Sequence, residues 1–268
     1  MNASDWHNKV CLITGGSSGL GLSIAKAFAE RGAKVVITAR RPDVLQQVAA
    51  KLGPNVTAIA ADVTLQDDVD RLREAVIASH GHLDLLCNCA GRSTRSAVLD
   101  ATVEDFQQFL DVNFLAAVRM TRAFAPILIE RQGHVVNISS LAGKVAPRYL
   151  GAYPASKFPL TAYSQQLRLE LGPQGLHVLL ACPGPILRDG AEPRYADKSA
   201  GLPESAQQPA AGAKLRGIDP EWLAQRIVAA CERREPELIV PWKVRVLLML
   251  AQISPKLGDW LLLRSTGG

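Results

Sequence analysis

Short runs of apolar residues recur along this chain, and segments with helical periodicity separate them. The runs are apolar throughout rather than alternating with polar residues, which is typical of strands in a parallel sheet that is covered on both faces. Consecutive parallel strands are joined by right-handed crossovers, for which the intervening helices are suited. No linker rich in Pro and Gly divides the chain, so the pattern predicts a single α/β domain. Its expected architecture is a doubly wound parallel sheet between two layers of helices.

The positions of the elements follow from these runs and from the glycines and prolines that end them. The expected strands are 9–14, 34–38, 56–61, 83–87, 134–139, 176–181 and 238–240, and the expected helices are 20–31, 43–52, 66–79, 103–131, 153–171 and one that begins at Asp219-Pro220. The pattern breaks after Cys182, and residues 186–217 have no clear period. A loop of this length inside a domain is usually functional or disordered, and we expect it to carry the substrate contacts.

Composition excludes several classes of protein. With 268 residues, 48% apolar and 21% charged, the chain is neither disordered nor a disulfide-built miniprotein. The net charge of +5 is spread out, without a run of five basic residues, so we expect no nucleic-acid partner. Five cysteines without a Cys-x-x-Cys pair predict reduced thiols, a cytoplasmic location and no metal site. The mean hydropathy of +0.08 requires a large core, an oligomer interface or a membrane surface.

A glycine-rich turn joins the first expected strand to the first expected helix, and it reads TGGSSGLG from Thr14 to Gly21. The amino end of a helix favours anions because its N–H groups are free and the helix dipole is positive there. Side chains in the turn would block a dinucleotide pyrophosphate from approaching. The residues expected to hold that group are Thr14, Gly15, Ser17, Ser18, Gly19, Leu20 and Gly21.

The spacing Gly-x-x-x-Gly-x-Gly differs from that of ordinary dinucleotide-binding dehydrogenases, and in it the chain resembles the short-chain dehydrogenase/reductase family. The resemblance covers roughly residues 8–185 and implies a Rossmann-type fold. It also implies that residues 1–241 form the catalytic domain and that residues 242–268 are an extension.

The residues after the second strand bear on the choice of cofactor. An acid about 20 residues beyond the glycine turn bonds the ribose 2′-hydroxyl in NAD-specific proteins. Ala39 takes that place here, and Arg40 and Arg41 follow. A guanidinium suits a 2′-phosphate, so we predict NADP(H) rather than NAD(H), read by Arg40 with help from Arg41 and Ser17. The alternative interpretation is that both arginines belong to a solvated loop.

Three further segments match the family's cofactor contacts. Asp62-Val63 matches its adenine-contact pair, although Asp62 equally suits a helix cap. The sequence Asn88-Cys89-Ala90-Gly91 stands where the family has Asn-Asn-Ala-Gly. The resemblance adds Asp62, Val63, Asn88, Ala90, Gly91, Pro183, Gly184 and Ile186 to the expected cofactor site. A threonine is common two positions after Ile186, and Arg188 stands there instead.

Tyr153 and Lys157 form the only Tyr-x-x-x-Lys of the chain. Residues four apart share one face of a helix. A nearby ammonium favours the phenolate and lowers the tyrosine pKa from its ordinary value of about 10, so the pair is suited to acid–base chemistry. The alternative interpretation is an incidental pair on a helix. Pro154 and Pro159 lie in the same predicted helix, and we expect Pro159 to kink it.

Two other residues match the family's catalytic pattern, namely Ser140, 13 residues before Tyr153, and Asn113. The resemblance therefore implies a tetrad of Asn113, Ser140, Tyr153 and Lys157, with Tyr153 and Lys157 also contacting the cofactor. Tyr153 would supply the proton and Ser140 would orient the carbonyl oxygen. Lys157 would hold the ribose and tune Tyr153, and Asn113 would hold a water that connects Lys157 to solvent.

We therefore expect an enzyme that transfers hydride between NADP(H) and a lipophilic ketone or secondary alcohol. The alternative is a noncatalytic protein of the same fold that binds NADP(H) and senses redox state. The family implies a homodimer or homotetramer. The apolar and basic segment 242–263 leaves three interpretations open: it packs over the substrate pocket, forms an oligomer contact, or lies peripherally on a membrane surface.

Overall fold

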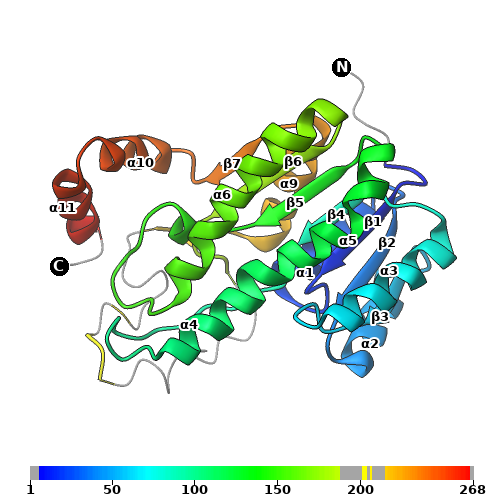
Figure 1. Ribbon diagram of the computed structural model, residues 1–268, viewed down its shortest axis with the longest axis horizontal. Coiled ribbons are helices and arrows are strands. Elements are labelled where there is room, and N and C mark those ends of the chain that lie inside the picture. Colours follow the sequence, from blue (N-terminus) through cyan, green and yellow to red (C-terminus); the bar gives the residue numbers. More distant parts are fainter. Residues whose placement is uncertain (1–5, 188–200, 204–205, 207–214, 266–268) are drawn as a thin grey trace.

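Seven parallel strands form one sheet in the order β3-β2-β1-β4-β5-β6-β7 (Figure 1). The computed structural model describes residues 6–187, 201–203, 206 and 215–265. The strands are β1 Val10–Thr14, β2 Lys34–Ala39, β3 Val56–Ala60, β4 Leu85–Asn88, β5 His134–Ile138, β6 His177–Pro183 and β7 Glu237–Val240. This arrangement confirms the predicted doubly wound α/β fold.

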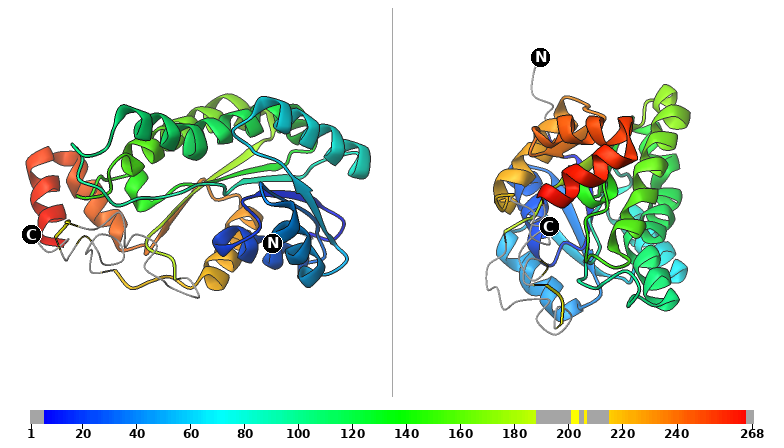
Figure 2. Two further views of the ribbon diagram at one scale, coloured as in Figure 1. Left: turned by 90° about the horizontal axis from the view of Figure 1, so that it is seen from below. Right: turned by 90° about the vertical axis from the view of Figure 1, so that its left-hand side faces the viewer.

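Helices cover both faces of the sheet, which gives the three layers visible in Figure 2. The helices α1, α2 and α9 pack on one face, and α3, α5 and α6 pack on the other. Their bounds are α1 Gly19–Ala29, α2 Pro42–Leu52, α3 Gln66–His80, α4 Val103–Leu110, α5 Ala116–Glu130, α6 Tyr153–Leu171 and α9 Pro220–Glu232. The side chain of Asp219 caps α9 through the Glu221 and Trp222 amides, as its sequence predicts.

The continuous apolar character of the strands follows from this double cover. In β1, Cys11 and Ile13 point into the core beneath α1, whereas Val10 and Leu12 point into the core beneath α3 and α5. Successive side chains of a strand alternate between the faces, so a strand buried on both faces is apolar at most of its positions. Four of the five cysteines are likewise buried, and none of the five forms a disulfide.

The sheet changes direction between β1 and β4. The chain runs outward from β1 through β2 to β3 and then returns to place β4 on the other side of β1. The connections that follow β1 and β4 therefore lead to helices on opposite faces of the sheet, and in open α/β sheets such a reversal leaves a crevice at the carboxyl ends of the strands. Ligands of open α/β sheets bind at such a reversal point.

One predicted helix is interrupted. The sequence predicts a single helix over 103–131, but a π-helical turn, Asp111–Leu115, separates α4 from α5. Met120, Phe124 and Leu128 are fully buried against the sheet. Val103–Glu130 is long and apolar enough to span a membrane by composition, but its buried side identifies it as a core helix. The helix α6, by contrast, continues through Pro159 without a break.

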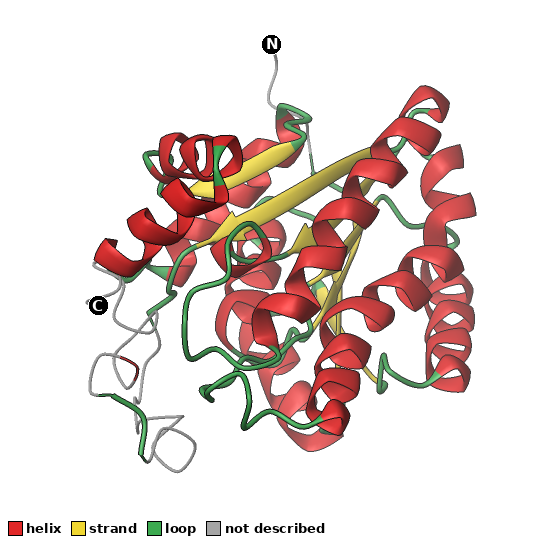
Figure 3. Ribbon diagram, turned by 60° about the vertical axis from the view of Figure 1, so that its left-hand side comes forward, coloured by secondary structure: helices red, strands yellow, loops and turns green. Residues whose placement is uncertain are grey.

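The chain beyond β7 forms two helices, α10 Val244–Ile253 and α11 Pro255–Ser265, at the margin of the molecule (Figure 3). Both contact each other, and α10 also contacts β7. The predicted loop 186–217 falls largely outside the described residues, and so does Arg188. Where that loop is described, Ile186 bridges Ile218.

Two histidines lie side by side at the end of the sheet opposite the crevice. The Nδ1 atoms of His134 and His177 are 2.8 Å apart, and His177 Nε2 lies 2.8 Å from the Glu235 carbonyl oxygen. His177 therefore donates from Nε2 and accepts at Nδ1, which requires the His177 ring to be neutral, and His134 donates to it from its own Nδ1. Burial, with the neighbouring ring, lowers the pKa of His134 to about 3, and burial lowers the pKa of His177 to about 4.

This pair predicts that lowering the pH destabilises the fold at pH values above those at which most carboxyl groups titrate. The unfolded chain binds protons at both histidines below pH 6.5, whereas the folded protein does not until about pH 4. The free energy of unfolding should therefore fall between pH 7 and pH 5 by about 2 kcal/mol for each histidine. Urea unfolding at the two pH values measures this, and the His134→Gln/His177→Gln variant should lose most of the dependence. An unchanged dependence in that variant would contradict the assignment.

Candidate active site

The turn between β1 and α1 is compact enough to require its glycines. Gly15 has a φ of +68°, and its amide donates to the Thr38 carbonyl oxygen at 2.8 Å. A side chain on Gly21 would collide with the Gly15 carbonyl oxygen, and one on Gly16 would lie 2.7 Å from Ile37. These glycines thus allow the turn to pack closely on itself and on β2.

The start of α1 suits an anion. Ser18 is in an extended conformation at the cap position, its side chain makes no capping hydrogen bond, and the first turn of the helix has no acidic residue. The first amides of a helix need partners from outside the helix, and the dipole favours a negative one. The predicted residues from Thr14 to Gly21 therefore fit the pyrophosphate of a dinucleotide.

Thr14 ties this turn to the one after β4. Its Oγ1 accepts hydrogen bonds from the amides of Cys89 and Ala90, at 3.0 and 2.9 Å. The two loops that diverge at the reversal point are thereby held in a fixed relation. Gly91, at the end of the second loop, lies next to the predicted catalytic residues, because a β-carbon there would be 2.7 Å from Asn113 Oδ1 and 3.4 Å from Lys157 Nζ.

The residues predicted to contact the adenosine half follow β2 and β3. Arg40 is exposed after β2. Arg41 occupies the cap position of α2 without a capping hydrogen bond from its side chain, and its guanidinium lies 3.8 Å from the Asp43 carboxylate. Asp62 Oδ1 accepts from the amide and the hydroxyl of Thr64, at 3.0 and 2.7 Å. Asp62 thus stabilises its own turn rather than capping α3, whose cap position is Leu65. Val63 is buried.

A buried row of polar side chains lies beneath the site and crosses it from α5 to α6. The Asn88 amide donates to Thr121 at 3.2 Å and to Asn137 at 2.9 Å, and the Asn137 amide donates to Ser164 at 2.9 Å. Buried polar groups that are paired in this way fix the positions of the elements that carry them. The Asn88 side chain therefore helps to hold β4 against β5.

Asn113 lies in the π-helical turn, and its side chain is engaged on both sides. Its Nδ2 donates to the Arg92 carbonyl oxygen at 2.9 Å and to Ser156 Oγ at 2.8 Å, while its Oδ1 accepts from the Arg92 amide at 2.9 Å. The side chain thus joins the loop after β4 to α6. Sequence reasoning missed Ser156, for which no motif gives a signal.

Lys157 is buried in α6 with its ammonium under the loop after β5. Its Nζ donates to the Ile138 carbonyl oxygen at 2.9 Å, and 5% of the residue is exposed. Burial lowers the pKa of Lys157 to about 8. The group is therefore a cation at neutral pH and yet close enough to neutrality to exchange protons in the working range of an enzyme.

Ser140 caps a short helical turn, Leu141–Gly143, and Tyr153 packs on that turn. Ser140 Oγ accepts from the Ala142 amide at 3.1 Å, which leaves its own proton for a ligand. Tyr153 packs on Ala142 and Leu150, and it begins α6 one turn before Lys157. Thr161 holds the turn in place by donating to the Gly143 carbonyl oxygen at 3.0 Å. Sequence reasoning did not identify Thr161.

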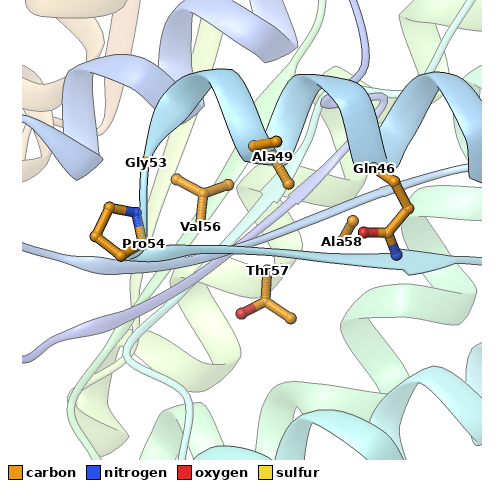
Figure 4. A pocket seen from close by; sticks show the side chains of 8 residues that line it. Gln46, Ala49, Gly53, Pro54, Val56, Thr57 and Ala58 are labelled. Atoms are coloured by element: carbon orange, nitrogen blue, oxygen red, sulfur yellow. The ribbon is translucent and has the colours of Figure 1, made fainter.

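The turn after β6 lies at the carboxyl edge of the sheet, where it is held to the end of β7 and to Ile218. The Gly184 amide donates to the Val240 carbonyl oxygen at 2.8 Å, and the Ile218 amide donates to the Pro185 carbonyl oxygen at 2.8 Å. Pro183 ends β6, and Ile186 packs against the core beneath α1 and α9. A shallow hollow between α2 and β3, lined by Gln46, Pro54 and Thr57 among others, lies at the outer strand of the sheet and holds none of these residues (Figure 4).

The chain is similar to known proteins in sequence and in fold. Residues 9–199 match the family model for short chain dehydrogenases. A Drosophila melanogaster protein named dehydrogenase/reductase SDR family protein 7-like is 30% identical over 95% of this chain and 79% of its own length.

Two solved structures are similar over most of their length. A short-chain dehydrogenase from Streptomyces avermitilis is 30% identical, with a TM-score of 0.81 and coverage of 97% of this chain and 98% of its own. The L-sorbose reductase of Gluconobacter frateurii, solved with NADPH and L-sorbose, is 30% identical with a TM-score of 0.77, over 89% of this chain and 97% of its own.

The burial of Lys157 predicts that this residue weakens the fold. Its pKa is about 8 in the folded protein and ordinarily near 10.5, so the charged form costs about 3 kcal/mol at neutral pH. Lys157→Met removes that cost and loses one hydrogen bond worth about 1 kcal/mol, so it should raise the free energy of unfolding at pH 7 by about 2 kcal/mol.

Urea unfolding of the two proteins measures this difference. The exposed Lys51 on α2 provides the control, because Lys51→Met should change stability by less than about 0.5 kcal/mol. The stability of the wild type should also rise relative to Lys157→Met between pH 8 and 10.5, where only the folded protein has lost the Lys157 proton. A Lys157→Met protein less stable than the wild type at pH 7 would refute the prediction.

Proposed function

This chain belongs to the short-chain dehydrogenase family and is an oxidoreductase, and on that premise we propose that it reduces a lipophilic ketone with NADPH or oxidises the corresponding secondary alcohol with NADP⁺. The observation that carries the proposal is the position of Tyr153. The tyrosine begins α6 at the carboxyl edge of the sheet, one helical turn before a buried ammonium and beside the Ser140 turn.

The bound nicotinamide supplies or accepts the hydride. In the reductive direction, Tyr153 donates its phenolic proton to the oxygen of the substrate as negative charge develops there. Ser140, whose Oγ accepts from the Ala142 amide, donates a hydrogen bond to the same oxygen, keeps its own proton and orients the carbonyl group. In the oxidative direction, Tyr153 accepts the hydroxyl proton of the alcohol.

Lys157 and Asn113 support that proton transfer. The Lys157 ammonium stabilises the phenolate of Tyr153 and is the group to hold the ribose hydroxyls. The Asn113 side chain is engaged with Arg92 and Ser156, so the water that leads from Lys157 to solvent is better assigned to the backbone of the π-helical turn than to this amide. π-Helical turns within α-helices are frequent at functional sites.

Arg40 supports the choice of NADP(H). It is exposed at the end of β2, Ala39 precedes it in place of an acid, and Arg41 is partly engaged with Asp43. A free guanidinium at this position suits the 2′-phosphate. The similar L-sorbose reductase was solved with NADPH.

The proposed oligomeric state, location and substrate class each have one supporting observation. Leu115 on the π-helical turn and Phe158 on α6 are 41% and 43% exposed, which suits a contact between copies of the chain in a homodimer or homotetramer. Cysteines that form no disulfide suit a cytoplasmic location. The apolar residues Leu141, Val145 and Leu215 gather in one cluster beside Ser140 and suit a lipophilic substrate.

Replacing the phenol tests the proposed chemistry. Tyr153→Phe should lower turnover of a ketone panel with NADPH by about a hundredfold to ten-thousandfold, because the proton donor is lost. Dinucleotide affinity, measured by calorimetry, should be retained. Tyr163→Phe, which changes another tyrosine of α6, should remain active.

Retained turnover in Tyr153→Phe would remove the tyrosine from its role. Dinucleotide binding without turnover of any ketone by the wild type would instead favour the alternative of a redox-sensing protein.

The 2′-phosphate contact has a separate test. Arg40→Ala should raise the KM for NADPH by about tenfold or more, because a charge-assisted hydrogen bond is lost, and should leave the KM for NADH unchanged. Arg41→Ala should have a smaller effect because Asp43 already engages that guanidinium. A wild-type KM that is lower for NADH than for NADPH would contradict the predicted preference.

A further inference from the structure

The helix α10 is apolar on two opposite faces. On the inner face, Leu248 is buried and Val244 is partly buried in a cluster that contains Ile239 of β7 and Leu141, the neighbour of Ser140. A helix that is apolar on only one side can bury that side against its own protein. The outer face of α10 is therefore the feature that needs explanation.

The outer face is a continuous exposed stripe. Val246, Met249, Leu250 and Ile253 are 50%, 60%, 39% and 77% exposed, and their spacing of three, four and seven positions places them on one side of the helix. Trp242, 68% exposed, lies one turn earlier. Scattered exposed apolar residues are normal, but contiguous ones mark an interaction surface.

The stripe belongs to a firmly packed unit rather than to a frayed end. The helices α10 and α11 cross at small residues, since a β-carbon on Gly258 would lie 3.1 Å from Ala251. The second helix adds Trp260 and Leu263, which are 50% and 44% exposed. The Arg264 guanidinium lies over the Trp260 ring at 4.6 Å.

The charges around the stripe are basic. Lys243 and Arg245 lie on either side of it by helical position, and α10 contains no acidic residue. Segment 242–265 has four basic side chains and one acidic one, Asp259. We propose that the outer face of the α10–α11 hairpin docks on the surface of an anionic lipid bilayer, with the stripe inserted among the acyl chains and the basic residues against the phosphates. This surface lies beyond the proposed oxidoreductase function and does not depend on it.

The charge distribution favours a lipid surface over a second copy of the chain. Two copies packed stripe to stripe would bring their Lys243 and Arg245 side chains to one shared rim, with no acid on α10 to pair with them, and like charges across an interface oppose association. An anionic bilayer attracts the same residues. The exposed tryptophans at both ends of the unit suit the headgroup level, where amphipathic rings gather.

Vesicle flotation tests the proposal. The full chain is mixed with vesicles of equal parts phosphatidylserine and phosphatidylcholine, or with vesicles of phosphatidylcholine alone, and the bound fraction is measured. We expect binding to the mixed vesicles and at least about tenfold weaker binding to the neutral ones. Met249→Gln/Ile253→Gln should weaken binding by at least about tenfold, because two apolar side chains no longer insert. Lys243→Gln/Arg245→Gln should weaken it about fivefold for each charge removed.

The control variant is Leu169→Gln, which replaces an apolar residue of α6 that is 70% exposed. It should bind vesicles as the wild type does. All of the replaced side chains are exposed, so circular dichroism should show folded protein throughout. Quenching of tryptophan fluorescence by brominated lipid provides a second measure, which should be lost in the Met249→Gln/Ile253→Gln variant.

Three results would overturn the proposal: a wild-type chain that floats with neither vesicle, equal binding to both vesicles, or a Met249→Gln/Ile253→Gln variant that still binds. A stable dimer in sedimentation that this variant dissociates, without vesicle binding, would assign the stripe to a second copy and refute the lipid surface. Ketone reduction is measured in the same samples. An active chain that never floats removes this inference alone, and a chain that floats but never turns over removes the proposed function alone.

Discussion

The burial of one ammonium group organises the candidate site. Lys157 Nζ donates to the carbonyl oxygen at the end of β5, so α6 is fixed against the carboxyl edge of the sheet. Tyr153 is placed one turn earlier on the same helix, and Ser139 Oγ reaches the Lys157 carbonyl oxygen at 3.4 Å, next to Ser140. Desolvating a charge weakens a fold, and such a cost persists where function requires it. The cost here is consistent with the proposed acid–base role of the tyrosine.

The rest of the site depends on where the sheet reverses. The loops after β1 and β4 diverge, and Thr14 fixes one against the other through two backbone amides. Asn113 then fixes the second loop to α6. Hydrogen bonds therefore join the glycine turn to the loop after β4, and that loop to α6. This rigidity suits chemistry that depends on holding two reactants in a fixed geometry.

Sequence reasoning identified the parts of this arrangement that depend on local spacing. The glycine turn and the Tyr153–Lys157 pair are short motifs whose geometry follows from a strand end or a helical turn, and the structure places both at the crevice. The π-helical turn around Asn113 was predicted as ordinary helix, because only contacts with Arg92 and Ser156, distant in sequence, distinguish it. The helix α6 continues through Pro159 to Leu171, so the proline does not end it. The exposure of the α10 stripe could not be predicted either, since apolar periodicity does not tell which face a helix buries.

The most direct test of the central claim is a titration of Lys157 itself. With lysine labelled by ¹³C at Cε, the resonance missing from Lys157→Met identifies the group, and its chemical shift is followed from neutral to alkaline pH. Burial of the ammonium predicts a midpoint at a pKa of about 8 for the free protein. A midpoint near the ordinary lysine value of about 10.4 would contradict the account, because the group would then be solvated and could not be the buried cation that organises the site.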